Sequence, residues 1–159
     1  MKRHPYLAAS LRLKSATGGT CFHRSAALML DLRGATLVFG VLRAATPEEQ
    51  AKTPGASPVP FIHAWVEYRN MLLAPTTLER TGMELKAMPL ADYYRVNAIT
   101  TTWRLDHAAF MQVAKRWNLA SALKHNSARA GDGRMVDALL AAAGVRYRLS
   151  DRRTVLPID

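Results

Sequence analysis

The sequence contains a single cysteine, Cys21, among its 159 residues. One cysteine cannot form an intramolecular disulfide, which is typical of proteins in a reducing compartment, and we expect a cytoplasmic protein. The histidines are scattered and have no neighbouring cysteines, so the ligand spacing of a zinc site is missing. We expect neither a metal nor another cofactor.

Long hydrophobic runs are also missing. No apolar stretch reaches the length of a transmembrane helix, and the basic residues 1–6 precede no signal-peptide core, so we expect no contact with a membrane. A hydrophobic fraction of 49% and a mean hydropathy of −0.08 are typical of globular proteins. We expect one domain over residues 1–159, with a core in 17–100 and a C-terminal helical extension in 103–144.

Acidic residues are few: 12 against 22 lysines and arginines, for a net charge of +10. The excess lies at the two ends, with +6 over residues 1–43 and +5 over 103–159, while residues 44–102 carry −1. Basic ends can meet an acidic partner or nucleic acid, but no nucleic-acid motif accompanies them. The sequence does not define the oligomeric state.

The residues around Cys21 predict a helix that follows a glycine turn. Helix formers continue to about residue 32, and Gly34 lies near the expected end. Cys21 then falls in the first turn, where free backbone N–H groups and the helix dipole favour a thiolate. The alternative is that Cys21 is a small buried hydrophobic residue.

Residues 60–77 predict a strand, a two-residue turn at Arg69-Asn70 and a return strand. Alternation places Phe61, His63, Trp65 and Glu67 on one face. Extended from the turn, the pairing places Thr76 opposite His63 and Ala74 opposite Trp65. A cysteine that opens a helix, followed by a histidine on a strand, is the arrangement of papain-like sites.

The other predicted elements are a short helix in 4–14, a central strand over 36–42, a short strand near 93–96, helices over 105–123 and 135–143, and a short strand in 145–149. A proline-containing loop over 43–60 leads into the His63 strand. It is either a lid over the site or a solvated insertion.

Three short stretches follow one another along the chain: Cys21-Phe22-His23-Arg24-Ser25-Ala26-Ala27-Leu28, Leu37-Val38-Phe39-Gly40-Val41 and His63-Ala64-Trp65-Val66-Glu67. Together they resemble the transglutaminase-like superfamily, and most of all its bacterial branch with the leader peptidases of lasso-peptide biosynthesis. The resemblance covers about residues 17–78. It implies an α+β, papain-like fold with the cysteine-bearing helix packed on an antiparallel sheet of residues 36–42, 61–68 and 71–76.

The resemblance also implies the site. Cys21 corresponds to the nucleophile and His63 to the base, Thr20 and Trp65 would form the site wall, and the substrate would be a peptide or protein. The family's third residue is different here, because its Asp-Pro-Thr is Ala74-Pro75-Thr76 in this chain. A carboxylate at that place orients the imidazole, and its loss is expected to cost activity.

Several side chains are candidates for the orienting role: Thr76 by the register, Glu67 on the same face but two pairs away, and Asp92 or Asn97 if the chain folds back. Two functions follow. One is a cysteine-dependent amide hydrolase or acyltransferase with a Cys21–His63 pair. The other is a catalytically impaired relative that binds an acidic partner, nucleic acid or an assembly.

Overall fold

The structure is a computed structural model. It describes Tyr6 and residues 20–42, 61–78, 82–97, 99, 101–124, 133–151 and 154–157. Within these ranges, the side chains of Thr20, Phe61 and Lys124 and of residues 74–78, 82–86 and 147–157 are not described. The expected helix in 4–14, apart from Tyr6, and the expected loop over 43–60 lie outside the described residues.

The described elements are, in chain order, α2 (Thr20–Asp31), β1 (Thr36–Leu42), β2 (Phe61–Tyr68), β3 (Met71–Leu78), β4 (Gly82–Pro89), α4 (Leu90–Val96), β5 (Thr102–Leu105), α5 (His107–Arg116), α6 (Leu119–Lys124), α7 (Gly133–Ala142), β6 (Tyr147–Asp151) and β7 (Thr154–Pro157). Five of the strands form one antiparallel sheet in the order β4-β3-β2-β1-β5, and β6 pairs with β7.

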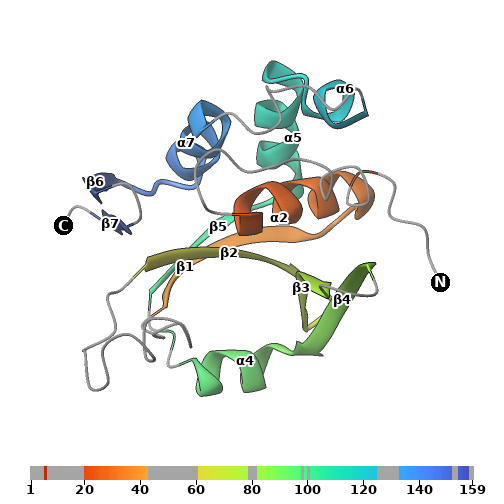
Figure 1. Ribbon diagram of the computed structural model, residues 1–159, viewed down its shortest axis with the longest axis vertical. Helices are drawn as coiled ribbons and strands as arrows, with labels where there is room; N and C mark the ends of the chain where they lie inside the picture. Colours follow the sequence, from red (N-terminus) through yellow and green to blue (C-terminus); the bar gives the residue numbers. More distant parts are fainter. Residues whose placement is uncertain are drawn as a thin grey trace.

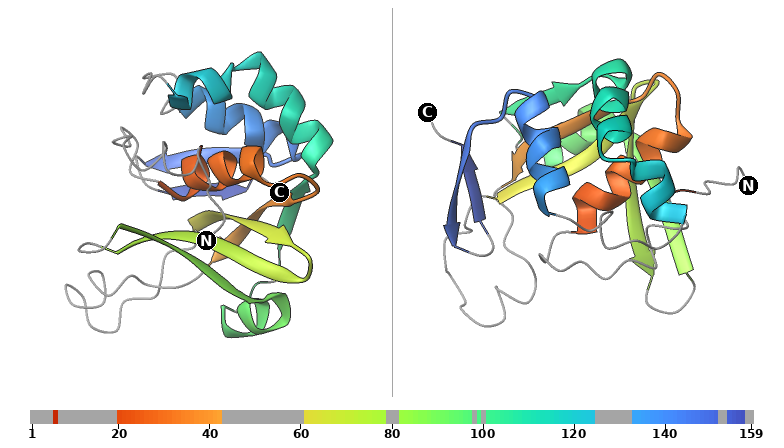
Figure 2. Two further views of the ribbon diagram at one scale, coloured as in Figure 1. Left: turned by 90° about the vertical axis from the view of Figure 1, so that its right-hand side faces the viewer. Right: turned by 90° about the horizontal axis from the view of Figure 1, so that it is seen from above.

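The helices lie in two layers around this sheet. Figure 1 shows α2, α5, α6 and α7 on one side of β1 and β2, with α4 on the opposite side, and Figure 2 shows the same layers from the side. The expected α+β class, with helices packed on an antiparallel sheet, is confirmed. No helix in the described ranges is both long and apolar enough to cross a bilayer.

Strand β2 is buried on both faces, and its residues alternate between two clusters. Ile62, Ala64 and Val66 belong to the main core, which includes four fully buried residues of α2. Trp65 belongs to a second cluster on the α4 side, with Val38, Leu72, Leu90, Tyr93, Tyr94 and Ile99. The face with His63, Trp65 and Glu67 is therefore the face that α4 covers.

The turn between β2 and β3 confirms the predicted hairpin. Arg69 and Asn70 both have positive φ, 51° and 61°, which suits a two-residue hairpin turn. The described register pairs Tyr68 with Met71, Glu67 with Leu72 and Val66 with Leu73. The expected pairs at Ala74 and Thr76 lie beyond these three, whereas β3 pairs with β4 along its whole length.

Two expectations about residues 78–124 are wrong. Residues 93–96 are part of the helix α4, not a strand, and β4 was not among the predicted elements. The single helix expected over 105–123 is two helices, because Asn118 adopts a positive φ of 51° between α5 and α6. Leu105, the first residue of that range, is the last residue of the strand β5.

Three helix ends have local capping residues, and the expected position of Gly34 near the end of the Cys21 helix is confirmed. Gly34 and Gly144 have φ of 76° and 81° and follow α2 and α7, as their capping role requires. Asp106, which precedes α5, accepts a 2.8 Å hydrogen bond from the Ala109 N–H. The expected C-terminal strand is β6, paired with β7.

Candidate functional site

Cys21 lies in the first turn of α2, and this part of the helix contacts Ala64 of β2. Ser25, one turn further along α2, donates its hydroxyl to the Ala64 carbonyl over 3.1 Å. The Ala64 N–H acts on the Cys21 thiol. Both peptide groups of Ala64 are thus directed at α2, and Ala64 directly follows His63 in β2. The structure therefore brings Cys21 to the backbone beside His63.

The Cys21 thiol is half-buried in the first turn of its helix. Burial raises its pKa above 9.0, while the N–H groups of Ala64, Phe22 and Cys21 and the charge of Arg24 act in the opposite direction. Burial is the largest of these effects, because removing a thiolate from water costs more than the N–H groups and Arg24 return. The N–H groups at the start of the helix therefore favour the thiolate, as expected, but burial outweighs them in the resting protein.

His63 lies on the opposite face of β2 from the α2 core, stacked on the Trp65 ring. The two ring centroids are 6.2 Å apart with an interplanar angle of 25°. Burial lowers the pKa of His63 from 6.5 to about 4. The imidazole is therefore neutral at physiological pH, the state in which it can accept a proton.

Tyr93 of α4 interacts electrostatically with the Cys21 thiol and packs on the face of the sheet that carries His63. Tyr93 packs edge-on against Trp65, with centroids 5.3 Å apart. Burial, and then the charge that Cys21 would carry as a thiolate, raise the pKa of Tyr93 to about 12. Cys21 is thus within electrostatic reach of the α4 face, although its helix lies on the other side of the sheet.

Glu67 is held in a hydrogen-bonded cluster on the same face. Its carboxylate is 6% exposed and accepts bonds from Trp65 Nε1–H at 3.1 Å and the Tyr94 hydroxyl at 2.7 Å. Arg104 of β5 forms an ion pair with the other carboxylate oxygen at 2.6 Å. Glu67 is thus bound to three other groups, with the Trp65 side chain between it and His63.

The other candidates for the orienting role have described contacts elsewhere. Asp92 forms an exposed ion pair with Arg95 at 3.2 Å, and the Asn97 amide donates to the Tyr93 carbonyl at 2.9 Å. The side chains of Thr20, Ala74 and Thr76 lie outside the described residues. Of the predicted site residues, the structure therefore describes the surroundings of Cys21, His63 and Trp65.

Sequence reasoning missed three contributors to this region. Tyr93 and Tyr94 were expected in a strand, although Leu90, Tyr93 and Tyr94 have helical spacing after Pro89, a signal for the observed helix. Arg104 gives no local signal, because its carboxylate partner lies two strands away in the sheet.

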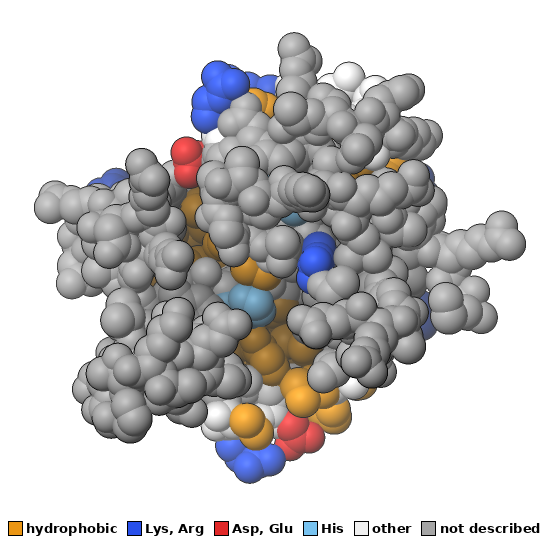
Figure 3. All heavy atoms as spheres, viewed as in Figure 1, with side chains coloured by type: hydrophobic (Ala, Val, Ile, Leu, Met, Phe, Trp, Pro, Cys, Tyr) orange, Lys and Arg blue, Asp and Glu red, His pale blue; other side chains and the backbone are white. Residues whose placement is uncertain are grey.

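One face of the molecule shows a histidine side chain near its middle, with hydrophobic side chains beside it and a basic side chain nearby (Figure 3). Among the described residues, no group of three or more His, Cys, Asp or Glu side chains is placed to hold a metal ion.

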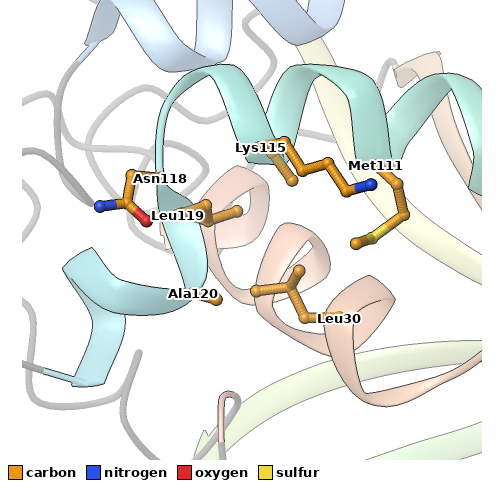
Figure 4. Close-up of a pocket in the computed structure, with 7 residues that line it drawn as sticks. Leu30, Met111, Lys115, Asn118, Leu119 and Ala120 are labelled. Carbon is orange, nitrogen blue, oxygen red and sulfur yellow. The ribbon is translucent and has the colours of Figure 1, made fainter.

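A pocket of about 180 Å³ lies elsewhere, between α2, α5 and α6. Figure 4 shows Leu30, Met111, Leu119 and Ala120 at this pocket, with Lys115 beside them. Leu30 is nine residues after Cys21 in α2, about 13 Å along the axis at the helical rise per residue. The pocket is therefore separate from the Cys21–His63 site.

Comparisons of the chain with models of protein families, with curated proteins and with solved structures found no match.

Proposed function

We propose that the protein is a cysteine-dependent amide hydrolase or acyltransferase of papain-like, transglutaminase-like type that acts on a peptide or protein. The observation that carries the proposal is the contact of the Cys21 turn with the peptide groups of Ala64, the residue beside His63. Support also comes from the neutral imidazole of His63 and the helix N-terminus at the thiol.

In the proposed reaction, His63 takes the thiol proton as Cys21 Sγ bonds to the carbonyl carbon. The carbonyl oxygen becomes an oxyanion, for which the Cys21 backbone N–H is a donor. The C–N bond then breaks as the departing amine takes the proton from His63, leaving a thioester. Water or a second amine, deprotonated by His63, attacks the thioester and releases the thiol.

The resting site is a neutral pair, and this limits the proposed activity. The thiol has a pKa above 9.0 and the imidazole a pKa of about 4, so a proton on His63 is unfavourable before substrate binds. A carboxylate beside His63 would raise its pKa, and the sequence has Ala74 where the family has aspartate. This observation favours the second candidate, a catalytically impaired binding module.

An activated acyl ester tests the first candidate. With a p-nitrophenyl ester of an N-acyl amino acid, Cys21 is expected to gain the acyl mass, because the sole cysteine makes the assignment unambiguous. His63→Gln is expected to slow acylation by about 10²- to 10⁴-fold, the range for general base catalysis. The control Cys21→Ala should give no adduct. Acylation of wild type no faster than that of a free thiol would reject the enzyme and leave the binding module.

A second experiment restores the family's carboxylate at residue 74. It distinguishes an impaired enzyme, which should become faster, from a protein in which residue 74 does not lie beside His63. Ala74→Asp is expected to raise the pKa of His63, lower that of Cys21 and speed acylation at neutral pH. If Ala74→Asp leaves the acylation rate unchanged and the new carboxylate faces solvent, residue 74 does not lie beside His63.

A further inference from the structure

Trp65 is fully buried, yet it is held by more than packing. Its indole N–H donates to Glu67 Oε1 over 3.1 Å. The edges of Tyr93 and Tyr94 meet the ring at centroid distances of 5.3 and 6.0 Å. The His63 imidazole is stacked on the same ring, with the centroids 6.2 Å apart. The indole is therefore fixed on one side by Glu67 and contacts His63 on another.

Glu67 connects three elements to this indole. It accepts from Trp65 in its own strand and from the Tyr94 hydroxyl of α4, and it pairs with Arg104 of β5. Arg104 also donates to the Tyr94 hydroxyl at 3.1 Å, which closes the network. The carboxylate thus has a donor from a helix and from a second strand as well as from the indole.

This arrangement is not needed for burial alone. A buried carboxylate loses hydration, and apolar side chains of similar size commonly give equal or greater stability. A phenylalanine would fill much of the Trp65 site without requiring a hydrogen-bond acceptor. What the cluster adds is a single orientation of the indole, because the N–H must point at Glu67.

Gly40 of the neighbouring strand β1 also indicates that the Trp65 ring has one fixed position. It pairs with His63 in the β1–β2 register, and a Cβ there would lie 2.8 Å from Trp65 Cζ3 and in hard contact with Cη2. The ring thus occupies space that any side chain at residue 40 would need.

We propose that Trp65 and Glu67 are positioning residues for His63. Glu67, held by Arg104 and Tyr94, fixes the indole, and the indole holds the imidazole in one orientation in a chain with Ala74 at the carboxylate position. The inference deepens the proposed function, since it assumes that His63 is the base of the reaction, but its first test does not depend on activity.

The test compares Trp65→Phe and Glu67→Gln with wild type by NMR of His63. Phenylalanine keeps an aromatic ring but loses the N–H, and glutamine keeps the shape of Glu67 but not its charge. In both variants we expect the ring-proton resonances of His63 to broaden or split, because an imidazole that is no longer held by the indole samples several orientations. Trp103→Phe, a partly buried tryptophan of the main core, is the control and should leave these resonances unchanged.

Each outcome decides the proposal. If Trp65→Phe and Glu67→Gln alter unfolding midpoints but leave the ring resonances of His63 as sharp as in wild type, the cluster is structural and the proposal is wrong. If Trp65→Phe does not fold, Glu67→Gln alone decides by the same criterion. If the His63 resonances broaden in a protein whose acylation does not depend on His63, the positioning role stands and the proposed enzyme activity is rejected.

Discussion

Gly40 offers the sharpest test of how the candidate site is built. Gly40→Ala adds one methyl group on the α4 face of β1, where Trp65 Cζ3 would be 2.8 Å away. Real Cβ atoms do not approach other atoms so closely, and Trp65 is fully buried, so the ring or the strand must shift. Overpacking of this kind costs about 1 to 3 kcal/mol.

Part of that cost is offset, because alanine in a strand is more favourable than glycine by about 0.5 to 1 kcal/mol. We therefore expect a net loss of about 0.5 to 2 kcal/mol in the free energy of unfolding. With a urea m-value of about 2 kcal/mol/M, the unfolding midpoint falls by about 0.25 to 1 M. Urea titration followed by circular dichroism measures this shift.

A double-mutant cycle identifies the cause. Trp65→Phe removes the ring atoms that the new methyl group would meet, so Gly40→Ala should cost clearly less in the Trp65→Phe background than in wild type. Equal costs in the two backgrounds would show that the methyl group meets something other than the indole, and a Gly40→Ala protein as stable as wild type would refute the close packing altogether.

Three further predictions concern the charged and polar groups. The pKa of His63 in the folded protein, about 4, lies below its unfolded value of 6.5, so the unfolded chain binds the proton first as pH falls. The free energy of unfolding should therefore fall between pH 6.5 and 4, by up to about 3 kcal/mol more than in His63→Gln, as urea titration at each pH can measure. Arg24→Gln should slow alkylation of Cys21 by iodoacetamide about two- to fivefold at pH 8, because the guanidinium favours the thiolate, while the exposed Arg33→Gln should not; equal rates in both variants would contradict the interaction. Thr76→Val should reduce acylation without moving the urea midpoint if Thr76 orients His63, and an unchanged rate would exclude that role.

The elements that the sequence predicts well are those whose signals are local. The helix at Cys21, the strand over 36–42 and the Arg69-Asn70 hairpin follow from periodicity and turn residues within a few positions of each other. Tyr93 and Tyr94 illustrate the opposite case. Two adjacent tyrosines favour a strand, but here their rings pack on Trp65 from a short helix.

Three properties, two of the candidate site and one of the helical layer, depend on contacts between distant segments, and the sequence did not predict them. The register of the hairpin was extended from the turn, yet the described pairing stops at Val66–Leu73, and Ala64 binds α2. The break at Asn118 needs a positive φ that helix propensity does not reveal. The pKa of Cys21 depends on burial, which opposes the helix N-terminus. In each case tertiary packing decided between alternatives that were locally equal.

The two-sided burial of β2 has a consequence for how this chain can change over generations. Adjacent residues of this one strand face different clusters, so β2 contributes both to the core with α2 and to the candidate site with α4. A substitution in β2 can change one of these two faces and leave the other intact. A single inserted or deleted residue would instead move the following side chains to the opposite face. We therefore expect the length of β2 to be kept during evolution while its residues vary.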